Sequence, residues 1–169
     1  MTDAAGKEAI DPVLNEHHCF GCGRHNPIGM HLEFERDGDG VVTRYTPRED
    51  DQGFPGVMHG GLLALLLDEA MGWAMYADRV FAVTAKMETR YRRPVELGPR
   101  LTVRARLISR RGRRMEIEGD IRDEAGDVLV EAKGLFMQMD PESEARALAT
   151  FEAGSPGWAQ WIERGRARG

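Results

Sequence analysis

Two acidic residues, Asp68 and Glu69, stand side by side in the most apolar stretch of the chain, residues 62–77. The sequence His-Gly-Gly at 59–61 comes directly before this stretch. A carboxylate in apolar surroundings is costly unless it is hydrogen-bonded or paired, and burial tends to raise its pKa. Such acids concentrate at functional sites, although structural ion pairs give the same pattern. The pair is therefore either reactive or an acid that pairs with an arginine of neighbouring strands.

The two glycines before the acids favour the reactive interpretation. Glycines at a helix start let backbone or ligand approach closely, and the first amides of a helix lack intrahelical partners. Those amides and the positive end of the helix dipole suit an anion or a developing oxyanion. Asp68 follows Gly60 by eight residues, a little over two helical turns. His59, taken alone, fits a structural residue at a helix start better than a catalytic base.

The elements that must position these residues follow from periodicity. The run 62–77 is apolar nearly all round, which predicts a long helix buried on more than one side. Alternation with period two predicts antiparallel strands after it. Their ranges are 82–91, 101–108, 114–122 and 127–138. Short polar links predict that the last three form a meander, and Asp-Gly-Asp-Gly at 37–40 predicts a hairpin before the helix. The fold class is α+β, with a curved antiparallel sheet around one central helix.

The chain has 169 residues and a formal net charge of −5, and this length fits a single domain. We expect an N-terminal arm at 1–18, the folded domain at 19–139, and a polar helical tail at 140–169 that carries Trp158 and Trp161. The acidic balance favours neither nucleic acid nor an anionic membrane as a partner. No signal peptide or membrane-spanning run is visible, and two cysteines fit a reducing compartment, so we expect a cytoplasmic location.

A Cys-x-x-Cys motif, Cys19 and Cys22, lies close to His17, His18 and His25. This grouping suggests zinc, but structural zinc sites usually need four ligands in two separated pairs, and no second pair exists. A redox motif would need a preceding strand and a following helix. We therefore expect a turn whose small cysteines pack under the sheet, with no metal and no cofactor.

Three segments of the sequence resemble a known family. They are "CFGCGRHNPIGMHLEF", "GVMHGGLLALLLDEAMGWA" and "AVTAKMETRYRRPVELG". Together they resemble the hotdog-fold thioesterases of the 4-hydroxybenzoyl-CoA thioesterase superfamily, in particular the PaaI-like subgroup of the phenylacetate pathway. The resemblance covers about residues 19–139. It implies a hotdog fold of five to six strands, hydrolysis of acyl-CoA-type thioesters, and homodimers or dimers of dimers with active sites shared between subunits.

The resemblance also implies roles for single residues. Asp68 falls on the catalytic carboxylate, which acts either as a general base or as a nucleophile. Gly60 falls on the backbone amide that polarises the thioester carbonyl, with Gly61 beside it. His59 falls on a positioning residue, and Thr84 on a Ser or Thr that orients water or substrate from the partner subunit.

The substrate-binding expectations are broader. Relatives often carry Asn or Gln six residues before the His; here that place is Gly53, so Gln52 matches only after a shift of one residue. Glu69 either tunes Asp68 or forms an ordinary ion pair. Arg90 and Arg92 either meet the phosphates of coenzyme A or are simply exposed on a strand.

A second function remains open, since one fold supports many activities. The alternative is a non-catalytic hotdog module that binds acyl-CoA. The retained Asp68 favours an enzyme, whereas acyl-CoA binding that persists without any need for Asp68 would favour the binding module.

Overall fold

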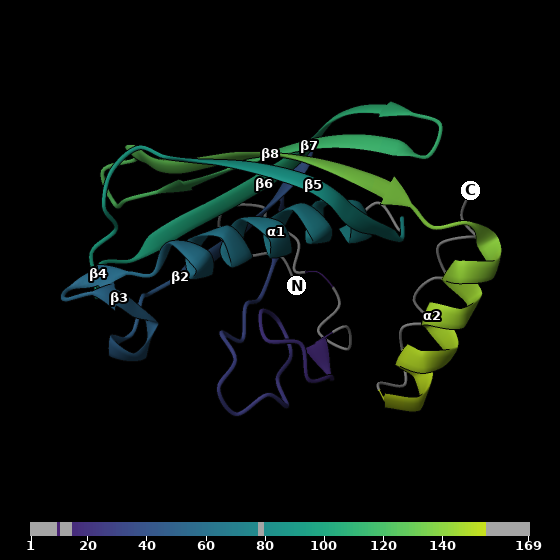
Figure 1. Ribbon diagram of the computed structural model, residues 1–169, viewed down its shortest axis with the longest axis horizontal. Coiled ribbons are helices and arrows are strands. Elements are labelled where there is room, and N and C mark those ends of the chain that lie inside the picture. Colours follow the sequence, from purple (N-terminus) through teal and green to yellow (C-terminus); the bar gives the residue numbers. More distant parts are fainter. Residues whose placement is uncertain (1–9, 11–14, 78–79, 155–169) are drawn as a thin grey trace.

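The computed structural model describes residues 10, 15–77 and 80–154. It places a long helix against one face of a curved antiparallel sheet, with the N-terminal segment on the other side of the helix (Figure 1). The elements are β1 (Glu35–Asp37), β2 (Gly40–Tyr45), a 3-10 turn (Glu49–Asp51), β3 (Gln52–Phe54), β4 (Val57–Met58), α1 (Gly60–Ala77), β5 (Ala82–Tyr91), β6 (Leu101–Arg111), β7 (Arg114–Arg122), β8 (Val128–Gln138) and α2 (Pro141–Gly154).

The main sheet has six strands in the order β1-β2-β6-β7-β8-β5, and all neighbours are antiparallel. This confirms the α+β hotdog fold, the β1–β2 hairpin and the β6–β7–β8 meander. Gly38 adopts a φ of 62° in the hairpin turn, where a residue without Cβ is least strained. Because β5 returns to the sheet beside β8, it becomes an edge strand that lies next to the helix (Figure 1).

The core forms between α1 and the inner face of the sheet. On β7 the residues Met115, Ile117 and Ile121 are buried while their neighbours point outward, as period two requires. They pack against a helix whose Leu66 and Met71 are fully buried. Complete burial of such side chains contributes about 1.5–3 kcal/mol each, so this layer contributes several kcal/mol to holding α1 in place.

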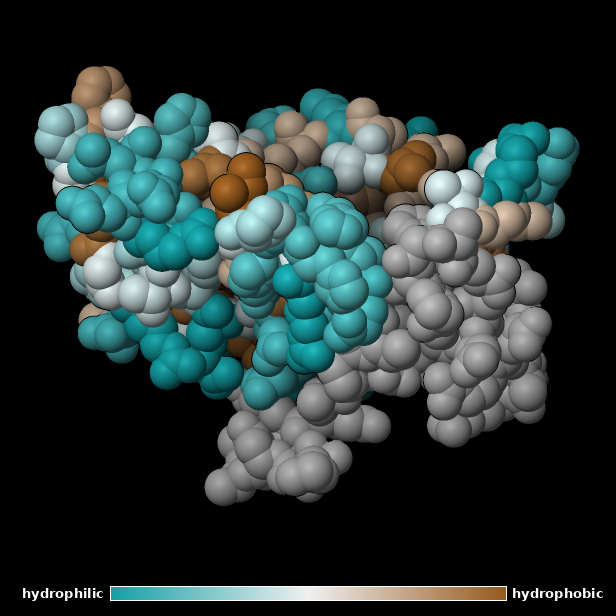
Figure 2. Space-filling model, turned by 90° about the horizontal axis from the view of Figure 1, so that it is seen from below, coloured by the Kyte–Doolittle hydropathy of each residue, from teal (hydrophilic) through white to brown (hydrophobic). Residues whose placement is uncertain are grey.

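The opposite side of α1 is covered by the N-terminal segment, so the expectation of a helix buried on more than one side is confirmed. The Cys19–Cys22 turn lies under this helix and not under the sheet, which corrects the expectation from sequence. The last residues of the expected arm are docked as well, because Asn15 is buried and donates to the carbonyl oxygens of Cys22 (2.8 Å) and Leu32 (3.1 Å). Seen from this side, the described surface is mostly hydrophilic (Figure 2).

A second helix, α2, follows the sheet at residues 141–154, within the region expected to be a helical tail. Asp140 precedes it, and its carboxylate accepts hydrogen bonds from the Ser143 amide (2.8 Å) and hydroxyl (3.0 Å), which caps the helix start. Trp158 and Trp161 lie outside the described residues, as does most of the expected arm. Among the helices described, none has the length and apolar character to cross a bilayer.

Candidate active site

Asp68 lies on the side of α1 that faces the beginning of β5. The hydroxyl of Thr84 donates a hydrogen bond to its carboxylate, with 2.7 Å between Oγ1 and Oδ1. Thr84 is exposed and Asp68 only partly buried, so solvent and small molecules can reach this pair. The resemblance implies that Thr84 orients water or substrate from the partner subunit. Within one chain the structure brings it to Asp68, because β5 passes the middle of α1 and runs back toward the helix start, where Tyr91 reaches Gly60.

The start of α1 is capped by His59. Its Nδ1 accepts a hydrogen bond from the Gly61 amide (2.9 Å), and its carbonyl oxygen accepts from Leu62 (3.0 Å) and Leu63 (3.2 Å). In the neutral ring the proton therefore lies on Nε2. Within the described part of the chain, the Gly60 amide has no hydrogen-bond partner, which leaves it available to an acceptor from outside.

The loop before His59 is held by a buried carboxylate that the sequence analysis missed. Asp51 accepts hydrogen bonds from the Tyr45 hydroxyl, the Arg48 amide (2.7 Å) and the Arg48 guanidinium (3.1 Å), and its carbonyl accepts from the His59 amide (2.8 Å). Burial raises the pKa of Asp51, but the hydrogen bonds from Arg48 and Tyr45 outweigh it, so this pKa lies below its usual value. Asp51 thus fixes the position of the helix start.

Tyr91, at the end of β5, is a second residue that the sequence analysis passed over. Its hydroxyl donates to the carbonyl oxygen of Gly60, with 2.9 Å between the atoms. The ring lies beside Gly60, where a Cβ would approach it to 3.5 Å. The two ends of β5 therefore contact the two parts of the site, Thr84 at Asp68 and Tyr91 at Gly60.

These two parts are well separated within one chain. Eight residues of helix, at about 1.5 Å each, put the alpha carbons of Gly60 and Asp68 about 12 Å apart. The amide and the carboxylate of the same chain therefore cannot both touch one thioester carbonyl.

Gln52 has a local role. Its Oε1 accepts a hydrogen bond from the Gly56 amide (2.8 Å) across the exposed β3–β4 turn. Gly53 lies against the cap, since a Cβ there would come within 3.0 Å of the His59 alpha carbon. The loop thus supports His59, and it gives Gln52 no contact with Asp68.

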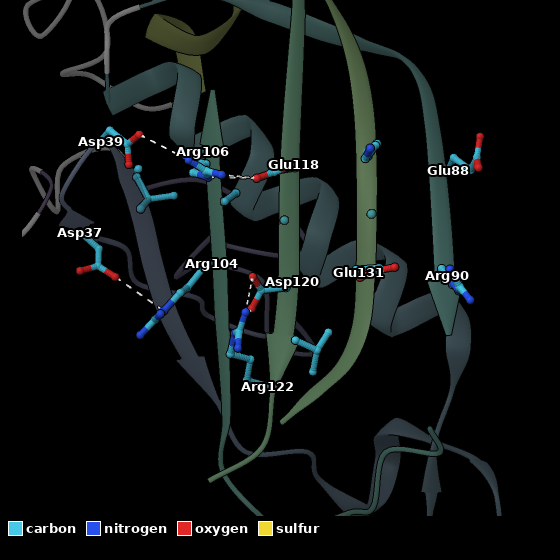
Figure 3. A pocket seen from close by; sticks show the side chains of 17 residues that line it. Asp37, Asp39, Glu88, Arg90, Arg104, Arg106, Glu118, Asp120, Arg122 and Glu131 are labelled. Atoms are coloured by element: carbon cyan, nitrogen blue, oxygen red, sulfur yellow. Dashed lines mark hydrogen bonds and ion pairs between the residues drawn. The ribbon is translucent and has the colours of Figure 1, made fainter. Parts of the chain in front are cut away.

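Arg90 and Arg92, which were expected either to meet the phosphates of coenzyme A or to be simply exposed, are both exposed. Arg90 alternates with Tyr91 and lies on the sheet face away from α1, near Glu88 (Figure 3). Arg92 forms an ion pair with Glu131, at 2.7 Å. Neither residue is brought to Asp68.

That outer face contains a broad hollow lined by charged side chains (Figure 3). Its arginines are largely paired with acids of the same face. The pairs are Arg104 with Asp37 (3.6 Å), Arg106 with Glu118 (2.6 Å) and Arg122 with Asp120 (2.6 Å). Compensated pairs of this kind leave little positive charge for an anionic ligand, so we place the candidate site at Asp68 and not in this hollow.

Glu69 points about 100° around α1 from Asp68, toward the N-terminal turn. The thiol of Cys19 donates to its Oε1 at 3.1 Å. Burial raises the pKa of Glu69 to about 8, and the neighbouring Cys19 and Asp68 add to this rise. Glu69 faces the N-terminal turn and forms no ion pair with any described lysine or arginine, but it interacts electrostatically with its neighbour Asp68.

With this geometry established, comparison with known proteins defines the class. The thioesterase superfamily pattern matches residues 55–130. The crystal structure of protein RHA08564, a thioesterase superfamily protein, is 35% identical and covers 80% of this chain and 72% of that chain, with a TM-score of 0.69. This chain therefore belongs to the thioesterase superfamily. Its structural neighbours also include PaaI proteins.

Two further relatives carry names that bear on activity. Acyl-coenzyme A thioesterase THEM4 of Bos taurus is 32% identical over 56% of this chain and 39% of that protein. A hypothetical thioesterase protein with coenzyme A, from Streptococcus pneumoniae TIGR4, is 22% identical over 64% of this chain and 85% of that chain, with a TM-score of 0.61. The chain spans 39–40% of the length of the curated acyl-coenzyme A thioesterases that it matches.

Proposed function

We propose that this protein is an acyl-CoA thioesterase in which Asp68 is the catalytic carboxylate. The observation that carries the proposal is the Thr84–Asp68 hydrogen bond of 2.7 Å at the open edge of the sheet. It fixes one carboxylate oxygen, while the other forms no hydrogen bond with any described residue. Names of relatives support the same substrate class, since one is an acyl-coenzyme A thioesterase and another contains coenzyme A.

The chemistry can follow either of two routes. As a general base, Asp68 takes a proton from water while the water oxygen attacks the thioester carbonyl; the carbon–sulfur bond then breaks, and the coenzyme A thiolate takes the proton back. As a nucleophile, Asp68 attacks the carbonyl itself, releases the thiolate and forms a mixed anhydride that water hydrolyses. Both routes give a free acid and coenzyme A, and both need a donor for the carbonyl oxygen.

The donor in this proposal is the Gly60 amide of a partner subunit. The spacing of about 12 Å along α1 separates Gly60 from Asp68 in one chain, whereas an antiparallel partner helix can place its start beside Asp68. β5 offers the contact, because it is an edge strand of ten residues with Val83 49% exposed and Tyr91 51% exposed. Unpaired edges of this length favour pairing with another chain, so we infer a homodimer or a dimer of dimers.

The test is release of free thiol from short, long and aromatic acyl-CoAs, measured for the wild type and for Asp68→Asn. We expect turnover of at least one class that collapses in the variant while acyl-CoA binding remains. Acyl-CoA binding without turnover in the wild type would favour the non-catalytic module instead. Light scattering on the same samples measures the oligomeric state, and an active monomer would overturn the shared site.

A further inference from the structure

The turn that contains Cys19 and Cys22 holds both sulfur atoms in a fixed relation. The backbone amide of Gly23 donates to the Cys19 carbonyl (3.0 Å), and the side-chain amide of the buried Asn15 donates to the Cys22 carbonyl (2.8 Å). A Cβ on Gly23 would lie 2.4 Å from the Cys19 nitrogen, so the tight turn needs glycine there. The backbone of the turn therefore sets where the two sulfur atoms lie.

A third ligand atom reaches this turn from the middle of α1. Oε1 of Glu69 lies 3.1 Å from the Cys19 sulfur, and the two sulfurs and the carboxylate oxygen all lie within 4.8 Å of one another. The chain makes room for it at Gly21, where a Cβ would lie only 2.3 Å from Glu69 Cγ. In a tetrahedral zinc site with Zn–S of about 2.3 Å, neighbouring ligand atoms lie roughly 3.3–3.8 Å apart, so small side-chain rotations suffice.

Loss of the protons of this cluster would call for a cation. Cys22 is 6% exposed, and both Cys19 and Glu69 are partly buried. No lysine or arginine of the described segments forms an ion pair with Glu69. Acidic groups that are desolvated without a cationic partner are costly, and a bound metal ion is one of the ways in which proteins compensate them.

We propose that Cys19, Cys22 and Glu69 bind one zinc ion, which fastens the N-terminal turn to the middle of α1. Two thiolates select zinc over magnesium or calcium, and binding releases the thiol protons to solvent. Three protein ligands leave the fourth position to water. His17 supports the site from outside: its Nδ1 accepts from the Cys19 amide (3.1 Å), which directs the Nε2 proton of the neutral ring toward the Cys22 sulfur 3.9 Å away.

The test uses the full chain without a histidine tag, reduced, freed of metal with a chelator, and titrated with Zn²⁺ and separately with Co²⁺. We expect about one ion per chain by mass spectrometry of the desalted protein, and an intense thiolate-to-cobalt absorption in the near ultraviolet. Glu69→Gln, which keeps the side-chain shape, should weaken zinc binding about 10-fold or more, and Cys19→Ser about 100-fold. The exposed His18 offers a matched control, His18→Gln, with wild-type affinity.

The proposal is overturned if the reduced wild type binds neither ion, or if Glu69→Gln and Cys19→Ser bind zinc as tightly as His18→Gln does. The cobalt spectrum of the wild type keeps the test decisive even if a cysteine variant fails to fold. Zinc binding is measured without any substrate, and Asp68→Asn should retain the ion, so the outcome is independent of the proposed thioesterase activity.

Discussion

Asp68 and Glu69 are consecutive residues of one helix, yet they lie in opposite kinds of environment. Asp68 faces the open edge of the sheet, where a neutral hydroxyl of Thr84 holds one oxygen and leaves the carboxylate accessible. Glu69 is turned by about 100° toward the N-terminal turn, where thiols surround it and burial raises its pKa to about 8. If Asp68 is the reactive acid, as we propose, burial and electrostatic perturbation do not by themselves mark that acid, and accessibility is the better guide.

The largest expected effect comes from neutralising each acid in turn with an isosteric amide. Asp68→Asn should lower kcat for the best acyl-CoA about 10³-fold, since loss of a general base costs about 10²–10⁴-fold. Glu69→Gln should lower kcat by no more than about 10-fold, because its carboxylate faces away from the site. Thiol-release kinetics on both variants check this, with circular dichroism to verify folding. A larger loss in Glu69→Gln than in Asp68→Asn would reverse the assignment of the two acids.

Prediction from sequence succeeded where short-range patterns decide the structure. The apolar run 62–77 and the alternation in 101–138 were sufficient for α1 and the β6–β7–β8 meander, because the period of burial is a local property. The His-Gly-Gly start and its spacing to Asp68 were likewise local.

The failures concern contacts that only the tertiary structure creates. Cys19 and Glu69 are 50 residues apart, so no spacing rule links the Cys-x-x-Cys motif to the helix. The contact of Tyr91 with Gly60 depends on strand parity, which the bulge between Thr84 and Lys86 resets within β5. In the sequence Asp51 looks like any other acidic loop residue, because its hydrogen bond with the Tyr45 hydroxyl forms only in the folded chain.

A third carboxylate, that of Asp51, extends the comparison. Like Glu69 it is removed from solvent, but unlike Glu69 it forms an ion pair, with Arg48. Asp51→Asn should destabilise the fold by about 2–3 kcal/mol at pH 7, since it weakens the hydrogen bonds to Arg48 and Tyr45 while Tyr45 stays buried. The exposed neighbour gives the control, Asp50→Asn, with a change of about 0.5 kcal/mol or less. Urea denaturation of both variants measures the free energies of unfolding.

The stability contribution of Asp51 should change with pH in a direction that can be checked. The pKa of Asp51 is lower in the folded state than in the unfolded chain, where it is about 3.9. Its contribution is therefore fully present above that unfolded value and is lost as the pH falls through the lower folded value. Between pH 5 and pH 3 the wild type should lose stability more steeply than Asp51→Asn. Parallel curves would mean that Asp51 does not carry the charge assigned to it.

A smaller effect tests how the active side of the helix is held. Thr84→Val removes the hydroxyl that donates to Asp68 and keeps the β-branched shape that suits a strand. A hydrogen bond to a charged group is worth about 1.5–3 kcal/mol, and exposure puts this one at the low end, so kcat should fall about 10-fold. Thr84→Ser keeps the hydroxyl and should restore most of the activity. Equal losses in both variants would point to strand packing and not to the hydrogen bond.

The smallest effect lies at the helix start, where Tyr91 donates to the Gly60 carbonyl from a position that is 51% exposed. Water can replace an exposed donor, so Tyr91→Phe should raise the activation free energy by only about 0.5–1 kcal/mol. The catalytic rate should therefore fall about 2- to 5-fold. If the Gly60 amide holds the carbonyl oxygen in the transition state, the loss should fall on kcat with KM unchanged. A rise in KM at constant kcat would instead place Tyr91 in substrate binding. That result would assign the Gly60 region to substrate binding and not to catalysis. Asp68 would then be the only residue of α1 to which we assign a catalytic role.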